Sequence, residues 1–245
     1  MRRVVPALLL LAAAPIANAA GGGAVDQAQT DLSNVAAIQR GAKLFVNYCQ
    51  GCHSAEYMRY SRIQEDLGLT EEQVEDNLIF GDAKVGDVMT VAMDTDDQVL
   101  WLGAKAPDLS LVARSRGVDW LYTYLRQFYV DDSRPTGWNN KLYPNVSMPN
   151  IFWEQQGIQN AVYETQEDEN GDPVEVLTGF EQVSAGTLSS EEFDQSMLDL
   201  VTFLEYLGEP AKLKREGIGI WVLLYLALFT FLAYLLKQEF WRDVK

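Results

Sequence analysis

The sequence predicts a mainly α-helical exported domain that is attached to a membrane by one C-terminal transmembrane helix. Three observations support this fold class. The N-terminus has the pattern of an export signal, a long uncharged apolar run lies near the C-terminus, and the segments between them repeat apolar residues at the spacing of an amphipathic helix. The intervening residues 21–210 are enough for one domain with its own hydrophobic core.

Residues 1–20 are expected to be a secretory signal peptide. Arg2 and Arg3 precede an apolar run over residues 4–14, and Ala17-Asn18-Ala19 is a typical cleavage pattern. Such a signal delivers the residues that follow it to the periplasm of a bacterium. We therefore expect residues 21–210 to form a periplasmic domain.

Residues 217–236 carry no charge and predict a transmembrane helix. At 1.5 Å per residue this run spans about 30 Å, the thickness of the hydrocarbon core of a bilayer. A buried helix of a soluble protein would show a polar stripe, which this run lacks. Basic residues are equally numerous on its two sides and do not decide the orientation, so the orientation rests on the signal peptide. Residues 211–216 are then a linker, and residues 237–245 a cytoplasmic tail.

Four helices are expected within the exported domain. Ser33 begins the first, whose apolar positions lead to Cys49, and Thr70 caps a second that ends at Ile79. An aromatic-rich helix covers residues 118–129. The last helix, residues 190–207, has a clear apolar stripe. Ser189 and Glu192 form a capping box at its start.

Two further features complete the predicted fold. Gly41 lies on or beside the apolar stripe of the first helix, where it would let the backbone of the last helix approach closely. Asn170-Gly171 predicts the turn of a hairpin in which Val162 and Tyr163 face Val174 and Val176. The remaining segments are expected to be loops.

The chain is strongly acidic, with 35 Asp and Glu residues against 19 Lys and Arg and a net charge of -16. This charge excludes nucleic acid as a partner. Acidic residues are concentrated in two segments, 94–97 and 164–175. Such runs are usually solvated loops, and the functional alternative is that they steer a basic, diffusing redox partner.

Cys49-Gln50-Gly51-Cys52-His53 contains both cysteines and the only histidine of the chain. A C-x-x-C-H run is the attachment pattern of a covalent c-type haem. On a helix, residues at i, i+3 and i+4 share a face, so Cys49 and Cys52 can bond one porphyrin and His53 can bind its iron. The second ring nitrogen of His53 should donate a hydrogen bond to a backbone carbonyl. A thioredoxin-like site would need a preceding strand, and a structural zinc site needs four ligands, for which no other Cys or His is available.

The second axial ligand cannot be histidine, which leaves methionine, lysine, a terminal amine or an empty position. Met148 is the preferred candidate, because prolines hold the loop over residues 143–150 in an extended form. Met58 is too close to His53 in sequence to reach the opposite haem face readily. Three other methionines are better explained by packing: Met89, Met93 and Met197.

Several segments together resemble the cytochrome c1 family, the haem-bearing subunits of quinol:cytochrome c reductase (bc1) complexes, in its proteobacterial form. The likeness covers nearly all of the chain after the signal peptide. The matching segments are residues 40–60, 106–110 with the sequence Ala-Pro-Asp-Leu-Ser, 134–140 with the sequence Arg-Pro-Thr-Gly-Trp-Asn-Asn, 148–149 and 203–210.

The resemblance implies a class I cytochrome c-like domain with insertions, in which Met148 is the axial ligand. It also implies that Arg116 approaches a haem propionate, for which a planar guanidinium is well suited, although a surface arginine is the simpler alternative. Pro107 and Trp120 are expected to pack against the haem. The chain has no extra cysteine pair, so a disulfide clamp of the kind described for the family is absent.

The function implied is one-electron transfer within the inner-membrane bc1 complex. Electrons would come from the Rieske iron-sulfur protein and leave to a soluble cytochrome c, with cytochrome b as the membrane partner and no catalysis by the isolated chain. Two alternatives remain: a membrane-anchored monohaem cytochrome that serves a terminal oxidase or a periplasmic dehydrogenase, and a membrane-anchored thiol-disulfide oxidoreductase.

Overall fold

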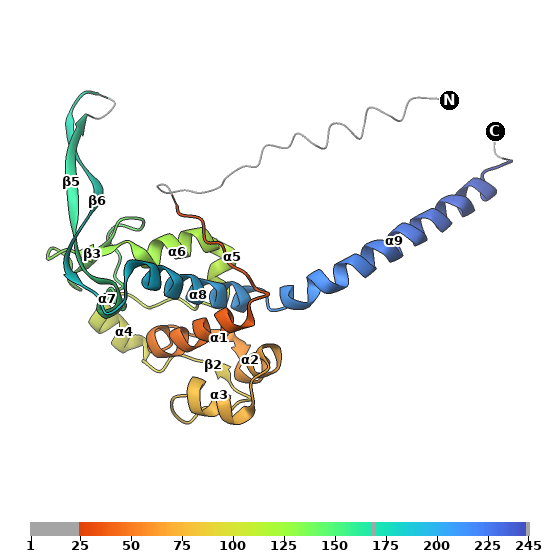
Figure 1. Cartoon of the computed structure of the whole chain (residues 1–245), viewed down its shortest axis with the longest axis horizontal. Helices are drawn as coiled ribbons and strands as arrows, with labels where there is room; N and C mark the ends of the chain where they lie inside the picture. The colour runs from red at the N-terminus through yellow and green to blue at the C-terminus, as the bar shows by residue number, and fades with distance from the viewer. Residues whose placement is uncertain (1–24, 168–169, 244–245) are drawn as a thin grey trace.

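The computed structural model describes residues 25–167 and 170–243. A body of packed helices carries two long projections, the hairpin of strands β5 and β6 at one end and the helix α9 at the other (Figure 1). The expected signal peptide, residues 1–20, lies outside the described residues. The last two residues of the expected cytoplasmic tail, 244–245, also lie outside them.

The helix that leads to Cys49 forms as expected, with two differences. Helix α1 (Val35–Leu44) is capped by Asn34, whose side chain accepts a hydrogen bond from the Ala37 N–H, rather than by Ser33. The helix then widens into a π-helix, η1 (Phe45–Cys49), whose hydrogen bonds run from residue i+5 to residue i, and it ends on the first cysteine of the motif. A single inserted residue of this kind is often found at functional sites.

Helix α8 (Ser190–Gly208) forms the centre of the core and confirms the predicted capping box. The Ser189 side chain accepts from the Glu192 N–H, and the Glu192 side chain accepts from the Ser189 N–H. Every member of its predicted apolar stripe is buried, and α8 packs against α1. The stripe consists of Phe193, Met197, Leu200, Val201, Leu204 and Leu207.

Gly41 is the point of closest approach between α1 and α8, as predicted. A Cβ atom at this position would lie 2.1 Å from the Asp199 carbonyl oxygen and 2.6 Å from the Phe203 Cβ. Beside this contact, Arg40 makes two hydrogen bonds to the Asp199 carboxylate, of 2.6 and 2.9 Å. The absence of a side chain at Gly41 is therefore a requirement of the helix pair.

We expect Gly41→Ala to destabilise the fold, although alanine ordinarily favours a helix over glycine by about 1 kcal/mol. The added methyl would meet backbone atoms, and overpacking of this kind costs about 1–3 kcal/mol. Chemical denaturation measures the effect. Gly179→Ala, at a strand position where a Cβ meets nothing within 4 Å, is the control. A Gly41→Ala protein as stable as the control would contradict the close approach.

The helices between α1 and α8 are all shorter than α8. Helix α3 (Glu71–Leu78) confirms the second predicted helix, and Thr70 caps it through a capping box with Gln73. Four more segments were expected to be loops and instead form helices of four to eight residues. They are α2 (Tyr60–Leu67), α4 (Thr95–Leu102), α5 (Val112–Arg116) and α7 (Trp153–Gln156).

The aromatic-rich helix ends earlier than predicted. Helix α6 covers Val118–Arg126, and the next apolar residues belong to strand β3 (Phe128–Val130). The strand forms because its backbone pairs with β4 (Trp138–Asn140) antiparallel and with β5 (Gly157–Glu167) parallel. Tertiary pairing thus overrides the helical pattern of the sequence.

The predicted hairpin is present, but its predicted register is wrong. Strands β5 and β6 (Pro173–Ala185) pair antiparallel, and Val162 lies opposite Gly179 instead of Val174 or Val176. The strands run further towards the tip than the sequence suggested, so residues nearer the turn take the valines as partners. A second, two-stranded sheet joins β1 (Ala55–Arg59) to β2 (Val88–Met89).

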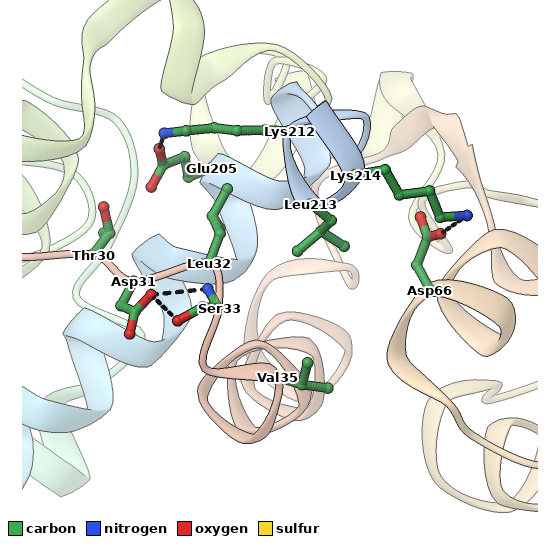
Figure 2. A pocket seen from close by; sticks show the side chains of 10 residues that line it. All are labelled: Thr30, Asp31, Leu32, Ser33, Val35, Asp66, Glu205, Lys212, Leu213 and Lys214. Atoms are coloured by element: carbon green, nitrogen blue, oxygen red, sulfur yellow. Dashed lines mark hydrogen bonds and ion pairs between the residues drawn. The ribbon is translucent and has the colours of Figure 1, made fainter. Parts of the chain in front are cut away.

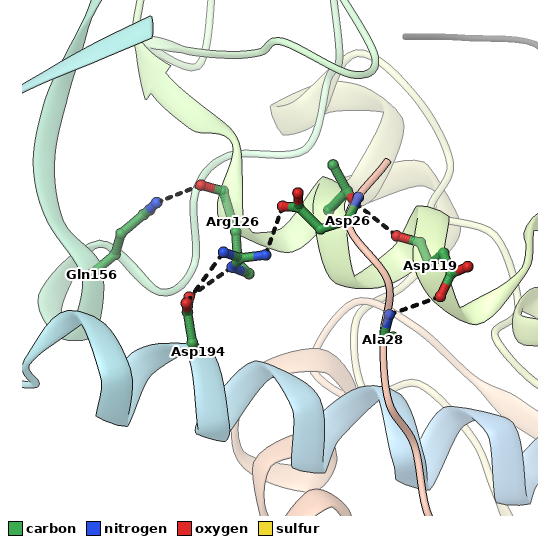
Figure 3. Close-up of polar contacts among 7 residues, drawn as sticks. Asp26, Ala28, Asp119, Arg126, Gln156 and Asp194 are labelled. Carbon is green, nitrogen blue, oxygen red and sulfur yellow. Dashed lines mark hydrogen bonds and ion pairs between the residues drawn. The ribbon is translucent and has the colours of Figure 1, made fainter. Parts of the chain in front are cut away.

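The N-terminal segment is fastened to the body through Arg126 at the end of α6 (Figure 3). The guanidinium donates to Asp194 on α8 at 2.6 Å and to Asp26 at 2.8 Å. The Ala28 N–H donates to the Asp119 carboxylate at 2.7 Å. One arginine therefore joins the start of the described chain to the central helix.

Helix α9 (Lys212–Phe240) begins earlier than expected, so most of the predicted linker is helical. Its segment Gly217–Phe240 is long and apolar enough to cross a membrane. The most apolar part of this segment is not buried in the domain. Ion pairs hold its first turn: Lys212 contacts Glu205 at 2.7 Å, and Lys214 contacts Asp66 at 3.4 Å, on the two sides of a cleft (Figure 2). These pairs connect the start of α9 to α8 and to α2.

Candidate haem site

The C-x-x-C-H motif forms a tight turn at the end of η1. The helix itself stops at Cys49, so the expectation that the whole motif lies on a helix is wrong in its last residues. The Cys49 carbonyl nevertheless accepts from the Cys52 N–H at 3.0 Å and from the His53 N–H at 2.8 Å. The turn thus keeps the backbone bonds that relate residues i, i+3 and i+4 in a helix.

His53 is held by one specific backbone carbonyl. Its Nδ1 atom lies 2.7 Å from the Pro107 carbonyl oxygen, 54 residues further along the chain. Burial lowers the pKa of His53, while the Pro107 carbonyl and the Asp108 carboxylate oppose that shift. A neutral imidazole that donates from Nδ1 has Nε2 as its free lone pair, which is the form that binds a metal. The expected carbonyl partner is confirmed, and it belongs to Pro107.

The two cysteines lie in surroundings unlike those of a redox dithiol. Cys49 is buried and Cys52 is half-buried. Burial raises the pKa of Cys49 to about 12, with a further contribution from Cys52, and burial also raises the pKa of Cys52. Thiol-disulfide oxidoreductases need a lowered thiol pKa, and their motif follows a strand rather than a helix. The site therefore favours thioether attachment over disulfide exchange.

Met148 lies in a loop that is fixed from several sides. Its Sδ atom accepts a hydrogen bond from the Tyr124 hydroxyl at 3.3 Å. The Asn139 side chain accepts from the Asn145 N–H at 2.8 Å, and Asn145 itself adopts a left-handed conformation (φ 64°) that asparagine tolerates. The buried Asn140 side chain accepts from two further N–H groups at the start of the loop. Sequence reasoning predicts Met148 as a ligand but did not anticipate the tyrosine and asparagines that hold it.

Arg116 and Trp120 belong to the same group of side chains as Met148. The Arg116 guanidinium lies 5.1 Å from the centre of the Trp120 ring and 5.9 Å from that of Tyr143. Trp120 in turn stacks on Tyr124 with ring centres 4.9 Å apart. Stacking on two aromatic faces directs the exposed guanidinium without using up its hydrogen-bond donors.

The predicted site residues therefore form two groups. Cys49, Cys52, His53 and Pro107 make one, and the other comprises Arg116, Trp120 and Met148. Among the described residues, no hydrogen bond, ion pair or ring contact joins the two groups, although both border the same core. A haem whose iron is ligated from both faces keeps its axial residues apart. The donor set of two thiols, one imidazole and one thioether fits such a group.

The family model described as the Cytochrome C1 family matches residues 27–244. The chain belongs to the cytochrome c1 family. It is 49% identical to the cytochrome c1 of Allochromatium vinosum over the full length of both chains. It is 28% identical to the cytochrome c1 of Rhodospirillum rubrum over 85% of this chain and 82% of that one. A Nitrosomonas europaea protein named ammonia monooxygenase gamma subunit is 42% identical over the full length of both.

Membership of the family confirms several predictions made from the sequence. The chain is a haem subunit of a bc1 complex, carries one covalent haem c, and is mainly helical with a C-terminal helix that anchors it to a membrane. Which residues hold the haem is a separate question, which the geometry of the two groups addresses.

Proposed function

We propose that this chain carries single electrons from the Rieske iron-sulfur protein to a soluble cytochrome c through a haem ligated by His53 and Met148. The observation that carries the proposal is the bond between His53 Nδ1 and the Pro107 carbonyl, which leaves Nε2 as the metal-binding nitrogen of the residue that follows Cys52. A bound haem supplies a one-electron iron couple. With both axial positions filled by side chains, the site is suited to electron transfer rather than to binding a substrate at iron.

Each residue of the site has a distinct part in this proposal. Cys49 and Cys52 would form the thioether bonds, and His53 and Met148 would bind the iron. Arg116 offers its guanidinium to a haem propionate from the surface of Trp120, over which it stacks. A neutral thioether opposite an imidazole raises the reduction potential, which suits a carrier near the end of a respiratory chain.

The partners and orientation follow from the same proposal. The expected signal peptide would place the haem domain in the periplasm, with α9 crossing the inner membrane beside cytochrome b. The ion pairs at the first turn of α9 would hold the haem domain at a constant height over the membrane. The chain would act as the electron-transfer subunit of quinol:cytochrome c reductase and would not catalyse a reaction by itself.

Purification in mild detergent tests the proposed partners. The chain should be recovered with a dihaem b-type protein and an iron-sulfur protein, and inhibitors of quinol oxidation should block its reduction by quinol. The matched control is direct reduction by dithionite, which these inhibitors should leave unchanged. Recovery only with an oxidase or a dehydrogenase, together with inhibitor-insensitive reduction, would instead favour a membrane-anchored cytochrome of another pathway.

A further inference from the structure

Gln98 is the only fully buried residue of helix α4, at 1% exposure. Its neighbours Val99, Leu100 and Trp101 are exposed, so an amide rather than an apolar face docks this helix on the domain. A buried amide loses its hydration and is retained only where its hydrogen bonds are replaced. The Gln98 amide must therefore find its hydrogen-bond partners within the protein.

The Gln98 side chain makes three hydrogen bonds, all to backbone groups. Its Nε2 atom donates to the carbonyl oxygens of Cys52 and Met93, each at 3.2 Å. Its Oε1 atom accepts from the Ala106 N–H at 2.8 Å. Both amide hydrogens and the amide oxygen are thus used, which matches the full donor capacity of the group.

Two of these bonds close a ring around the histidine. Cys52 and Ala106, which Gln98 joins, immediately precede His53 and Pro107, which the histidine side chain joins at 2.7 Å. The amide therefore forms a second bridge beside the histidine bridge. Pro107 has no N–H of its own, so its backbone nitrogen cannot make a hydrogen bond in place of the one to Ala106.

The other side of the histidine is fastened independently. The Leu109 N–H donates to the Ser54 carbonyl at 2.8 Å, and the Glu56 N–H donates to the Asp108 carboxylate at 2.9 Å. These two bonds hold the residues after Pro107. The Gln98 side chain holds Ala106, the residue before it. The Pro107 carbonyl is consequently fixed from both sides only while Gln98 is present.

We propose that Gln98 is a positioning residue that sets the hydrogen bond between His53 and the Pro107 carbonyl and, through it, the reduction potential. The inference rests on the proposed ligation of iron by His53. A firm bond from Nδ1 gives the imidazole more anionic character and makes it a stronger donor to iron, which stabilises the oxidised state. Loosening the carbonyl should therefore raise the potential.

The test compares the full-length haem protein with Gln98→Met, which has a similar volume and no amide, and with Gln98→Asn. Asparagine keeps the amide but is one methylene too short to reach Cys52 and Ala106 together. We expect the potential to rise in the order Gln, Asn, Met while the covalent haem content stays unchanged. The asparagine variant keeps the test available if the methionine variant does not fold.

A second measurement reports on the hydrogen bond itself. His53 is the only histidine of the chain, so ¹⁵N-histidine labelling of the purified protein gives the signals of this one ring. In the reduced state the Nδ1 proton should exchange with solvent faster in Gln98→Met than in the parent. A residue with a merely structural role would lower stability without changing this exchange rate.

Thr202→Val is the matched control. Thr202 is 1% exposed on α8, and its hydroxyl donates to the Leu198 carbonyl at 2.7 Å, outside the ring of bonds around His53. The control should lower the unfolding temperature and leave the potential and the proton exchange as in the parent. A Gln98→Met protein whose potential and exchange rate match those of Thr202→Val would overturn the proposal. If the ¹⁵N signals of the parent showed no bond to iron, the ligand assignment itself would fail, whatever Gln98 does.

Discussion

The double substitution Cys49→Ala and Cys52→Ala is expected to abolish covalent attachment of the haem. Both thiols of the chain lie in this one turn, related by the hydrogen bond from the Cys52 N–H to the Cys49 carbonyl at 3.0 Å. No further cysteine could form a thioether in their place. Acidified acetone, which extracts non-covalent haem, followed by a visible spectrum of the protein fraction measures the loss.

Gly51→Ala is the control for this experiment. Gly51 lies between the two cysteines, is exposed, and has nothing within 4 Å of the Cβ that alanine would add. It changes the motif without removing a thiol, and its haem should survive extraction. Acetone-resistant haem at the parental level in the double alanine variant would disprove attachment through these cysteines.

Features that depend on residues close together in the sequence could be predicted from it. The capping boxes at Thr70 and Ser189 each involve residues three positions apart, and both are present. The apolar stripe of α8 repeats over several turns, and Gly41 marks the helix that meets it. Each of these signals depends on local geometry, which the sequence specifies directly.

Features that depend on distant pairing could not be predicted in the same way. Phe128 and Tyr129 are compatible with the end of a helix or with a short strand, and only the partner residues of β4 and β5 decide between the two. The predicted register of the hairpin was wrong because the strands stay paired as far as Glu167 and Pro173, so the two valines pair with residues nearer the turn.

The candidate site shows the same division between local and distant signals. The motif identifies Cys49, Cys52 and His53, because their spacing is itself the signal. It indicates that a carbonyl should hold the histidine, but nothing local connects His53 to Pro107 or to Gln98. Polar residues that are buried in order to hold a loop leave no periodic pattern, so only the folded arrangement reveals them.

Met148→Leu is expected to keep the haem attached and to lower its reduction potential by a large margin. Leucine has a similar volume and no sulfur, so the thioether cysteines and His53 are unaffected while the sixth ligand is lost. A soft, neutral thioether favours ferrous iron, and its removal therefore favours the oxidised state. Redox titration measures the potential, and the near-infrared sulfur-to-iron band of the oxidised protein should disappear.

The control is the same chemical change at another methionine. Met197 is fully buried in the apolar stripe of α8, so Met197→Leu should alter packing and leave the near-infrared band in place. Met148 differs from it in its surroundings, because a tyrosine hydroxyl meets its sulfur at 3.3 Å and a hydrogen-bonded loop carries it. If the band persisted in Met148→Leu, the ligand would have to be another methionine, and Met89 and Met93 would be the next positions to replace.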